Sequence, residues 1–212
     1  MKCVVMANGG YGDLNLYRSI FQEDVLLLCA DGGANYARKL NLIPYCIVGD
    51  MDSIEAETGE YYRHLNVAAK EYPREKDATD LQLALNMAGE LKATDITLLG
   101  TLGGRLDHTL SNLYSCMELA EKGCDILHFH PGCIVYITAK NIKIQGRPGD
   151  TVSVLALTEQ CYGVTEKGFE YPLDNALMEK RNPFAVSNVL TGSNGYISID
   201  KGVLAVFHFL RP

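Results

Sequence analysis

The sequence lacks the features that mark several large classes of protein. Its 212 residues contain no apolar run of membrane-spanning length, and the apolar start at 4–7 is too short for a signal peptide. Neither the G-x-x-x-x-G-K-[ST] pattern of a P-loop nor the G-x-G-x-x-G pattern of a dinucleotide-binding loop occurs. A P-loop kinase and a simple Rossmann dehydrogenase are therefore disfavoured.

Positive charge and paired cysteines are also scarce. The chain has 19 basic and 26 acidic residues, a formal net charge of -7, which argues against a general nucleic-acid binder. Its 7 cysteines form no C-x-x-C pair, and no spacing supports a zinc site. An odd number of thiols, several in apolar runs, predicts a reduced, cytoplasmic protein.

The first part of the chain alternates short apolar runs with helical patterns. We expect strands at 3–7, 25–29, 46–48, 67–71, 96–99 and 126–129. We expect helices at 13–21, 34–40, 54–63, 78–91 and 107–121. The apolar runs are rich in Val, Ile and Leu and hardly alternate, as in strands covered on both faces. This order predicts a mostly parallel, Rossmann-like α/β sheet with helices on both faces.

After residue 131 the pattern changes to short strands separated by Gly, Pro, Asp and Asn turns. We expect strands at 133–138, 142–145, 151–157, 162–167, 184–190, 195–198 and 203–209. No amphipathic helix is evident, so a small antiparallel β-sandwich is predicted. The fold class is thus α/β followed by all-β, with domains at 1–130 and 131–212.

Two acidic pairs, Asp50 with Asp52 and Asp77 with Asp80, follow the third and fourth expected strands. Residues two apart in an extended segment face the same side, so the first pair directs both carboxylates one way. Helix capping is the alternative, by Asp52 or Ser53 near 54, and by the second pair near 78. Two acidic pairs in adjacent loops nevertheless favour a hard cation such as Mg²⁺, shared with nucleotide phosphates.

Polar segments stand at the carboxyl ends of the expected strands, where open parallel sheets bind ligands. They cover 8–10, 31–35, 49–53, 76–80 and 100–107. In the last, Gly103-Gly104-Arg105 offers backbone amides and a guanidinium to phosphate oxygens. Gly32-Gly33 alone is more often a tight turn. Ser187-Asn188, in the later part, is either a turn or a pair of substrate-binding groups.

Four segments in this order, DGGANYA, GDMDS, KDATDLQLAL and GTLGGRLDHTLSNL, resemble those of the thiamine pyrophosphokinase family. The late Ser187-Asn188 pair fits as well, and the resemblance covers nearly the whole chain. It implies an ATP- and Mg²⁺-binding α/β catalytic domain, a thiamine-binding β-sandwich and a homodimer with the active site at the subunit interface. It also implies transfer of the β,γ-pyrophosphoryl group of ATP to the hydroxyl of thiamine, with release of AMP.

The resemblance implies roles for individual residues of this chain. The metal ligands would be Asp50, Asp52 and Asp77. The nucleotide would be bound by Gly32, Gly33, Thr79, Thr101, Gly103, Gly104 and Arg105. Catalysis would use Asp52, Asp77, Asp80, Arg105 and Asp107, and thiamine would meet Ser187 and Asn188. Related sequences often place a tryptophan near the Ser-Asn pair, whereas this chain has none, so Tyr196 or Phe184 is a candidate replacement.

Two other functions stay open at this point. A pyrophosphokinase for another small alcohol, such as a hydroxymethylpterin, would show the same metal and ATP residues. A non-catalytic nucleotide-binding regulatory module is the second. The intact set of Asp50, Asp52, Asp77 and Arg105 argues against the module, because a sensor does not need a complete metal site.

Overall fold

The computed structural model describes residues 1–21 and 24–211, which divide into two compact units. The first unit comprises Met1–Ser115 with His128–His130, and the second comprises Cys116–Leu127 with Pro131–Pro212, although Pro212 lies outside the described residues. The expected α/β and all-β fold classes are confirmed, while the expected boundary at 130 stays a prediction. In the described part, no helix is both long and apolar enough to cross a membrane.

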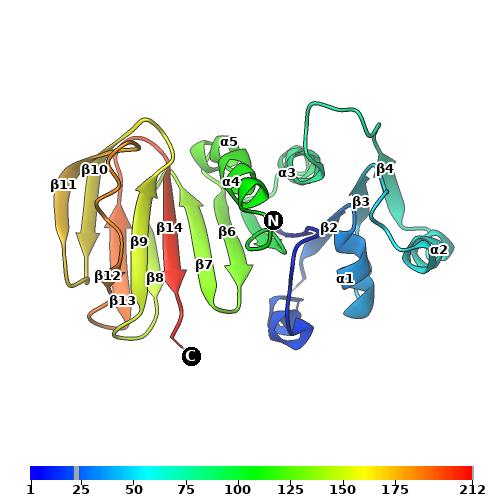
Figure 1. Ribbon diagram of the computed structural model, residues 1–212, viewed down its shortest axis with the longest axis horizontal. Coiled ribbons are helices and arrows are strands. Elements are labelled where there is room, and N and C mark those ends of the chain that lie inside the picture. The colour runs from blue at the N-terminus through cyan, green and yellow to red at the C-terminus, as the bar shows by residue number, and fades with distance from the viewer. Residues whose placement is uncertain (22–23, 212) are drawn as a thin grey trace. The chain divides into compact units, whose positions relative to one another are not determined.

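The first unit is a parallel sheet in the order β5-β1-β2-β3-β4. Its elements are β1 (Lys2–Met6), the 3-10 helix η1 (Leu14–Phe21), β2 (Leu26–Ala30), α1 (Gly33–Lys39), β3 (Cys46–Gly49), α2 (Ala56–His64), β4 (Ala68–Glu71), α3 (Asp80–Glu90), β5 (Asp95–Leu99), α4 (Leu106–Ser115) and the end of β6 (Asp125–His130). α1 and α3 lie on opposite faces of the sheet (Figure 1). β1, β2 and β3 are buried on both faces, which explains why their sequences do not alternate, whereas the edge strand β4 is exposed.

The helix starts differ from the caps considered for the acidic residues. α3 begins after Thr79, whose Oγ1 accepts from the Gln82 amide at 3.2 Å while the Gln82 side chain accepts from the Thr79 amide at 2.8 Å. α2 begins at Ala56 with Glu55 at its N-cap. The capping interpretations of both acidic pairs are therefore wrong, so these carboxylates do not cap either helix and remain available to bind a ligand.

One expected helix, at 107–121, is interrupted in the structure. It ends as α4 and resumes as α5 (Met117–Glu121) in the second unit. Ser115 Oγ donates to the carbonyl of Ser111 at 2.7 Å, a hydrogen bond within the last turn of α4 of the kind that bends helices.

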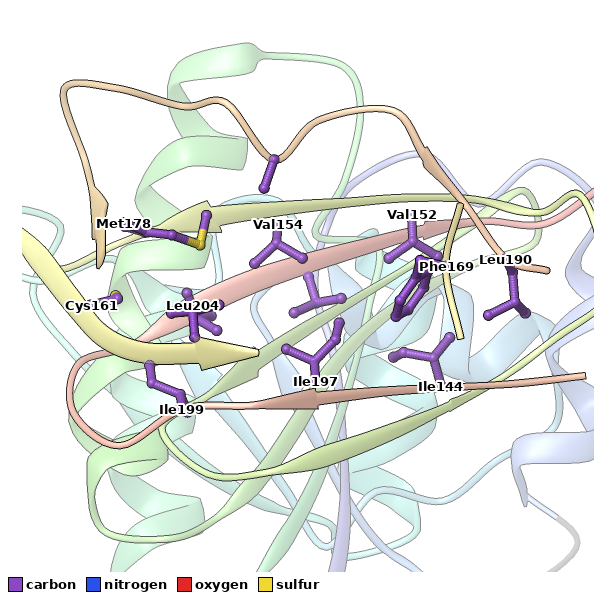
Figure 2. Packing of buried hydrophobic residues seen from close by; sticks show 14 residues of the cluster. Ile144, Val152, Val154, Cys161, Phe169, Met178, Leu190, Ile197, Ile199 and Leu204 are labelled. Carbon is purple, nitrogen blue, oxygen red and sulfur yellow. The ribbon is translucent and has the colours of Figure 1, made fainter. Parts of the chain in front are cut away.

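The second unit contains two antiparallel sheets, ordered β12-β9-β14-β7 and β11-β10-β13-β8. Its strands are β7 (Cys133–Thr138), β8 (Ile142–Gln145), β9 (Thr151–Ala156), β10 (Gln160–Lys167), β11 (Leu173–Glu179), β12 (Asn188–Val189), β13 (Asn194–Ser198) and β14 (Leu204–Phe209). Figure 2 shows Val152, Val154 and Leu204 of the first sheet facing Ile144 and Ile197 of the second. The predicted sandwich thus has a continuous apolar core between its sheets.

Two strand predictions in this unit were wrong. The strand expected at 184–190 is reduced to β12, because Ser187 adopts a left-handed φ of 60° that interrupts an extended ladder. β11 was not expected, since two register shifts in its pairing with β10 break the simple alternation of buried and exposed residues.

Candidate active site

A cleft of about 570 Å³ in the first unit is lined by loops that follow each of its strands β1 to β5. The lining residues fall within 7–10, 30–31, 52–53, 74–81 and 100–112. The carboxyl ends of parallel strands meet at one edge of the sheet, so five separate sequence segments contribute to one surface.

An acidic cluster of Asp31, Asp50 and Asp52 lies at this edge, with one oxygen of each carboxylate within 4.8 Å of the others. The backbone arranges it: the Ser53 amide donates to Asp31 Oδ1, and the Asp52 amide donates to Asp50 Oδ1, both at 3.3 Å. Three carboxylate oxygens this close repel one another unless a cation is shared. Hard oxygen donors of this kind suit Mg²⁺.

Gly49, at the end of β3, has a φ of 151° and packs closely against the acidic loops. A Cβ atom placed there would lie 3.0 Å from both Asp31 Cβ and Asp80 Oδ1. A side chain at this position would therefore displace Asp31 of the cluster and Asp80 beside it.

Lys76 already supplies one positive charge to this region. Its Nζ lies 3.1 Å from Asp50 Oδ2 and 3.1 Å from Asp80 Oδ1, and all three side chains are largely buried. The hydrogen bond from Lys76 lowers the pKa of Asp50, whereas burial raises the pKa of Asp80. Burial alone would lower the pKa of Lys76, but its two carboxylate partners outweigh this effect and raise it. Arg74 adds a second cation, 3.1 Å from Asp52.

The glycine-rich loop after β5 forms another wall of the cleft. Gly103 and Gly104 have φ values of 83° and 66°, and a Cβ atom at either would meet open space, so their backbone is accessible to a ligand. Arg105 is exposed and forms a two-contact ion pair with Asp107, at 2.6 and 3.2 Å. The hydrogen bond from Arg105 lowers the pKa of Asp107 to about 2.

The structure brings some of the predicted site residues together and leaves others apart. The cleft is lined by Asp52, Thr79, Asp80, Thr101, Gly103, Gly104 and Arg105. Asp50 joins the acidic cluster beside it. Asp77 is exposed and, with Asp107, Gly32 and Gly33, is absent from the described lining. Gly32 and Gly33 instead permit close packing, because a Cβ atom there would collide with Asn8 and with the Met6 carbonyl, respectively.

Several lining residues had no role in the sequence-based prediction. They are Asn8, Asp31, Arg74, His108 and Asn112. Asp31 had the clearest signal, since it opens the Asp-Gly-Gly loop after β2, but only the fold shows that it meets Asp50 and Asp52.

In the second unit, Ser187 is exposed whereas Asn188 is 5 % exposed. Tyr171 lies beside Asn188, which hydrogen-bonds both its backbone N–H and its carbonyl, and the Tyr171 ring is exposed. Tyr196 instead pairs with Lys143 and Lys167 on neighbouring strands and lines a separate hollow with them. Tyr171 is therefore a third aromatic candidate for the missing tryptophan, and one that the sequence reasoning did not identify.

Comparison with known families finds two matches. The model described as "Thiamin pyrophosphokinase, catalytic domain" matches residues 17–128, and "Thiamin pyrophosphokinase, vitamin B1 binding domain" matches residues 140–204. A thiamine pyrophosphokinase of Bacillus subtilis is 31% identical over 217 residues, covering 96% of this chain and 97% of that protein. Thiamine pyrophosphokinase 1 of Oryza sativa is 25% identical, covering 84% of this chain and 77% of that protein.

Crystal structures agree with this similarity. That of thiamin pyrophosphokinase from Geobacillus thermodenitrificans superposes with a TM-score of 0.86 at 26% identity, covering 100% of this chain and 98% of the other. That of the Bacillus subtilis enzyme also has a TM-score of 0.86, at 24% identity and with 100% of both chains covered. Both units of this chain thus share their fold with these enzymes.

Proposed function

The chain belongs to the thiamin pyrophosphokinase family, and we propose that it transfers the pyrophosphoryl group of ATP to the hydroxyl of thiamine, giving thiamine diphosphate and AMP. The observation that carries this proposal is the acidic cluster facing a glycine-rich loop across one cleft, within the unit that the catalytic-domain model matches. The relatives named above are thiamine pyrophosphokinases, which does not favour a pterin alcohol or a regulatory module.

The donor set of the cleft fits Mg²⁺. Asp31, Asp50 and Asp52 would hold the ion, and it would neutralise charge on the phosphate oxygens of ATP. Asp77, the third ligand expected from the sequence, is exposed and lies outside this cluster, so its role as a metal ligand stays a prediction.

The cations and bare backbone of the cleft suit the triphosphate. Pyrophosphoryl transfer depends mainly on positioning and on stabilising negative charge, with little covalent help from the protein. Lys76 and Arg105 are among the residues that line the cleft, and the amides of Gly103 and Gly104 in the same lining are accessible. Asp80 or Asp107 would orient the acceptor hydroxyl, and Asp80 is the better placed because it lines the cleft.

We further propose a homodimer in which the exposed Ser187 of one subunit completes the thiamine site of the other, with the Tyr171 ring against the thiamine ring. The vitamin B1 binding model covers both residues, and both are accessible. The 7 cysteines, 5 of them buried, support a reducing, cytoplasmic environment. Sedimentation at micromolar concentration tests the assembly, and a mass of one chain would contradict it.

The activity is tested by incubating the protein with ATP, Mg²⁺ and thiamine and separating the nucleotides by chromatography. We expect AMP as the nucleotide product. ADP would contradict pyrophosphoryl transfer, and AMP formed with a hydroxymethylpterin but not with thiamine would identify the other substrate.

The metal ligands are separated by three variants, Asp52→Asn, Asp31→Asn and Asp77→Asn. If the cluster holds the metal, the first two lose at least about a thousandfold in kcat, as expected for groups that stabilise transition-state charge, while Asp77→Asn keeps most activity. Circular dichroism checks the fold, and Asp174→Asn, an exposed position on β11 of the second unit, is the matched control. The reverse order for Asp31→Asn and Asp77→Asn would restore the ligand set expected from the sequence.

A further inference from the structure

The side chain of Asn188 has no hydrogen-bonding capacity left for a ligand. Its Nδ2 donates to Glu166 Oε2 at 2.9 Å and to the Tyr171 carbonyl at 2.8 Å. Its Oδ1 accepts from the amides of Tyr171 at 3.0 Å and Val189 at 2.9 Å. A primary amide has two N–H donors and an oxygen with two lone pairs, so all four positions are taken. The Asn188 side chain therefore holds neighbouring protein groups in place, and direct contact with a substrate falls to the residues beside it.

Those neighbours are Ser187 on one side and Tyr171 on the other. Ser187 is exposed and held in a left-handed conformation, φ 60°, with its amide donating to Ser153 Oγ at 2.9 Å. Such a conformation is costly for a residue other than glycine and persists only when surrounding contacts impose it. The Glu170 amide also donates to the Val189 carbonyl at 2.9 Å, which ties the two segments together. The Asn188 side chain thus holds the backbone of Tyr171 and of Val189, and so helps to hold the segment that carries Ser187.

Glu166 anchors the Asn188 side chain from the interior of the sandwich. It lies on β10, between β11 and β13, and is fully buried. Its Oε2 accepts from Asn188, while its Oε1 has no hydrogen-bond partner among the described residues. Burial raises the pKa of Glu166, and the hydrogen bond from Asn188 opposes this only in part. A buried carboxyl with a single polar partner is costly to the fold, and no cation among the described residues pairs with it.

We propose that Glu166 is a positioning residue for the organic substrate, acting through Asn188 to fix the backbone of Ser187 and Tyr171. This inference rests on the proposed function, because it assigns the 187–188 segment to the thiamine side of the site. Glu166 itself touches no substrate. Glu166 lies on a central strand, so its side chain can hold the exposed segment around Ser187 in a fixed position.

The test is a pair of variants, Glu166→Leu and Glu166→Gln, in the full-length protein. Leucine removes the acceptor for Asn188, and we expect the KM for thiamine to rise about tenfold while the KM for ATP stays within about twofold, because a buried donor is left unpaired. Glutamine keeps a neutral oxygen in the same place, so the KM for thiamine should stay within about threefold of the wild type. Amide exchange of Tyr171 and Val189 should quicken with leucine and not with glutamine.

Met178→Ala is the matched control for general loosening of the sandwich. Met178 is also fully buried, and it lies at the opposite end of the core from Phe169 and Leu190 (Figure 2). It should lower Tm without changing the KM for thiamine. The inference would be overturned if the KM for thiamine rose equally in Met178→Ala, or if it were unchanged in Glu166→Leu. Either result would leave the proposed function intact.

Two further outcomes are decisive. If Glu166→Leu does not fold, Glu166→Gln still decides: a tenfold rise in the KM for thiamine would contradict the role of the oxygen. If the wild type releases no AMP from ATP and thiamine, the proposed function fails, and the inference fails with it.

Discussion

Replacing His128 should change how the first unit responds to acid. His128 is on β6, is fully buried, and its Nδ1 lies 2.8 Å from Oγ1 of Thr101, which lines the cleft. The carbonyl of Thr101 accepts from Asn112 at 2.9 Å. Burial lowers the pKa of His128 from 6.5 to about 3, so the folded ring stays neutral well below neutral pH.

The size of the effect follows from this difference in pKa. Between pH 6.5 and pH 3 the unfolded imidazole binds a proton that the folded one does not. His128 therefore leaves the free energy of unfolding unchanged above pH 6.5 and lowers it as the pH falls below 6.5. At about 1.4 kcal/mol for each pH unit below 6.5, His128 removes roughly 2 kcal/mol of unfolding free energy between pH 7.5 and pH 5.0. That is a large fraction of the stability of an ordinary domain.

The assay is urea unfolding of wild type and His128→Asn from pH 7.5 to 5.0, followed by far-ultraviolet circular dichroism because the chain has no tryptophan. Asparagine places an amide near the position of Nδ1 and does not titrate. His130→Asn, an exposed position on the same strand, is the control and should keep the wild-type dependence. Wild type should lose roughly 2 kcal/mol more than His128→Asn over this range, and parallel profiles would refute the reasoning.

Three other predictions concern backbone packing, capping and charge. Gly33→Ala should destabilise by about 1–3 kcal/mol in urea unfolding, because its Cβ would collide with the carbonyl of Met6. Gly59→Ala, in α2 with no atom closer than 3.9 Å, should be neutral or stabilising; similar losses for both would contradict this. Thr79→Ala removes the capping box and should cost about 1 kcal/mol, and an unchanged urea midpoint would argue against the cap. Lys76→Met leaves its two aspartate partners without a cation, so Mg²⁺ should raise its Tm by at least about 2 °C more than that of the wild type. Equal increases in Tm with Mg²⁺ for both proteins would show that Lys76 does not offset the negative charge of these carboxylates.

Much of the fold could be predicted from local sequence patterns. Short Val- and Leu-rich runs ending in Gly and Asp predicted the parallel strands of the first unit, because burial on both faces and a sharp turn leave a direct mark on neighbouring residues. The antiparallel unit was harder. β11 was missed because its two register shifts obscure the alternation of buried and exposed residues. The strand expected at 184–190 was too long because Ser187 adopts a left-handed conformation, and no glycine at that position indicates this in the sequence.

The candidate site shows the same division. Asp50 and Asp52 could be chosen from their spacing, since they are neighbours along the chain. Asp31, which completes the cluster, comes from a different loop, so its distance to the other two depends on strand order in the sheet.

By itself, the sequence determined the two kinds of architecture, the Gly- and Asp-rich loops and a family resemblance that the comparisons confirmed. Only the tertiary structure decided which carboxylates lie close enough together to hold a cation. It alone also showed that the Asn188 side chain is hydrogen-bonded to Glu166 and Tyr171 while Ser187 remains exposed. The physical reason is that residue type and spacing record local conformation. Repulsion between carboxylates and the filling of hydrogen-bonding positions depend instead on distances between segments far apart in the chain.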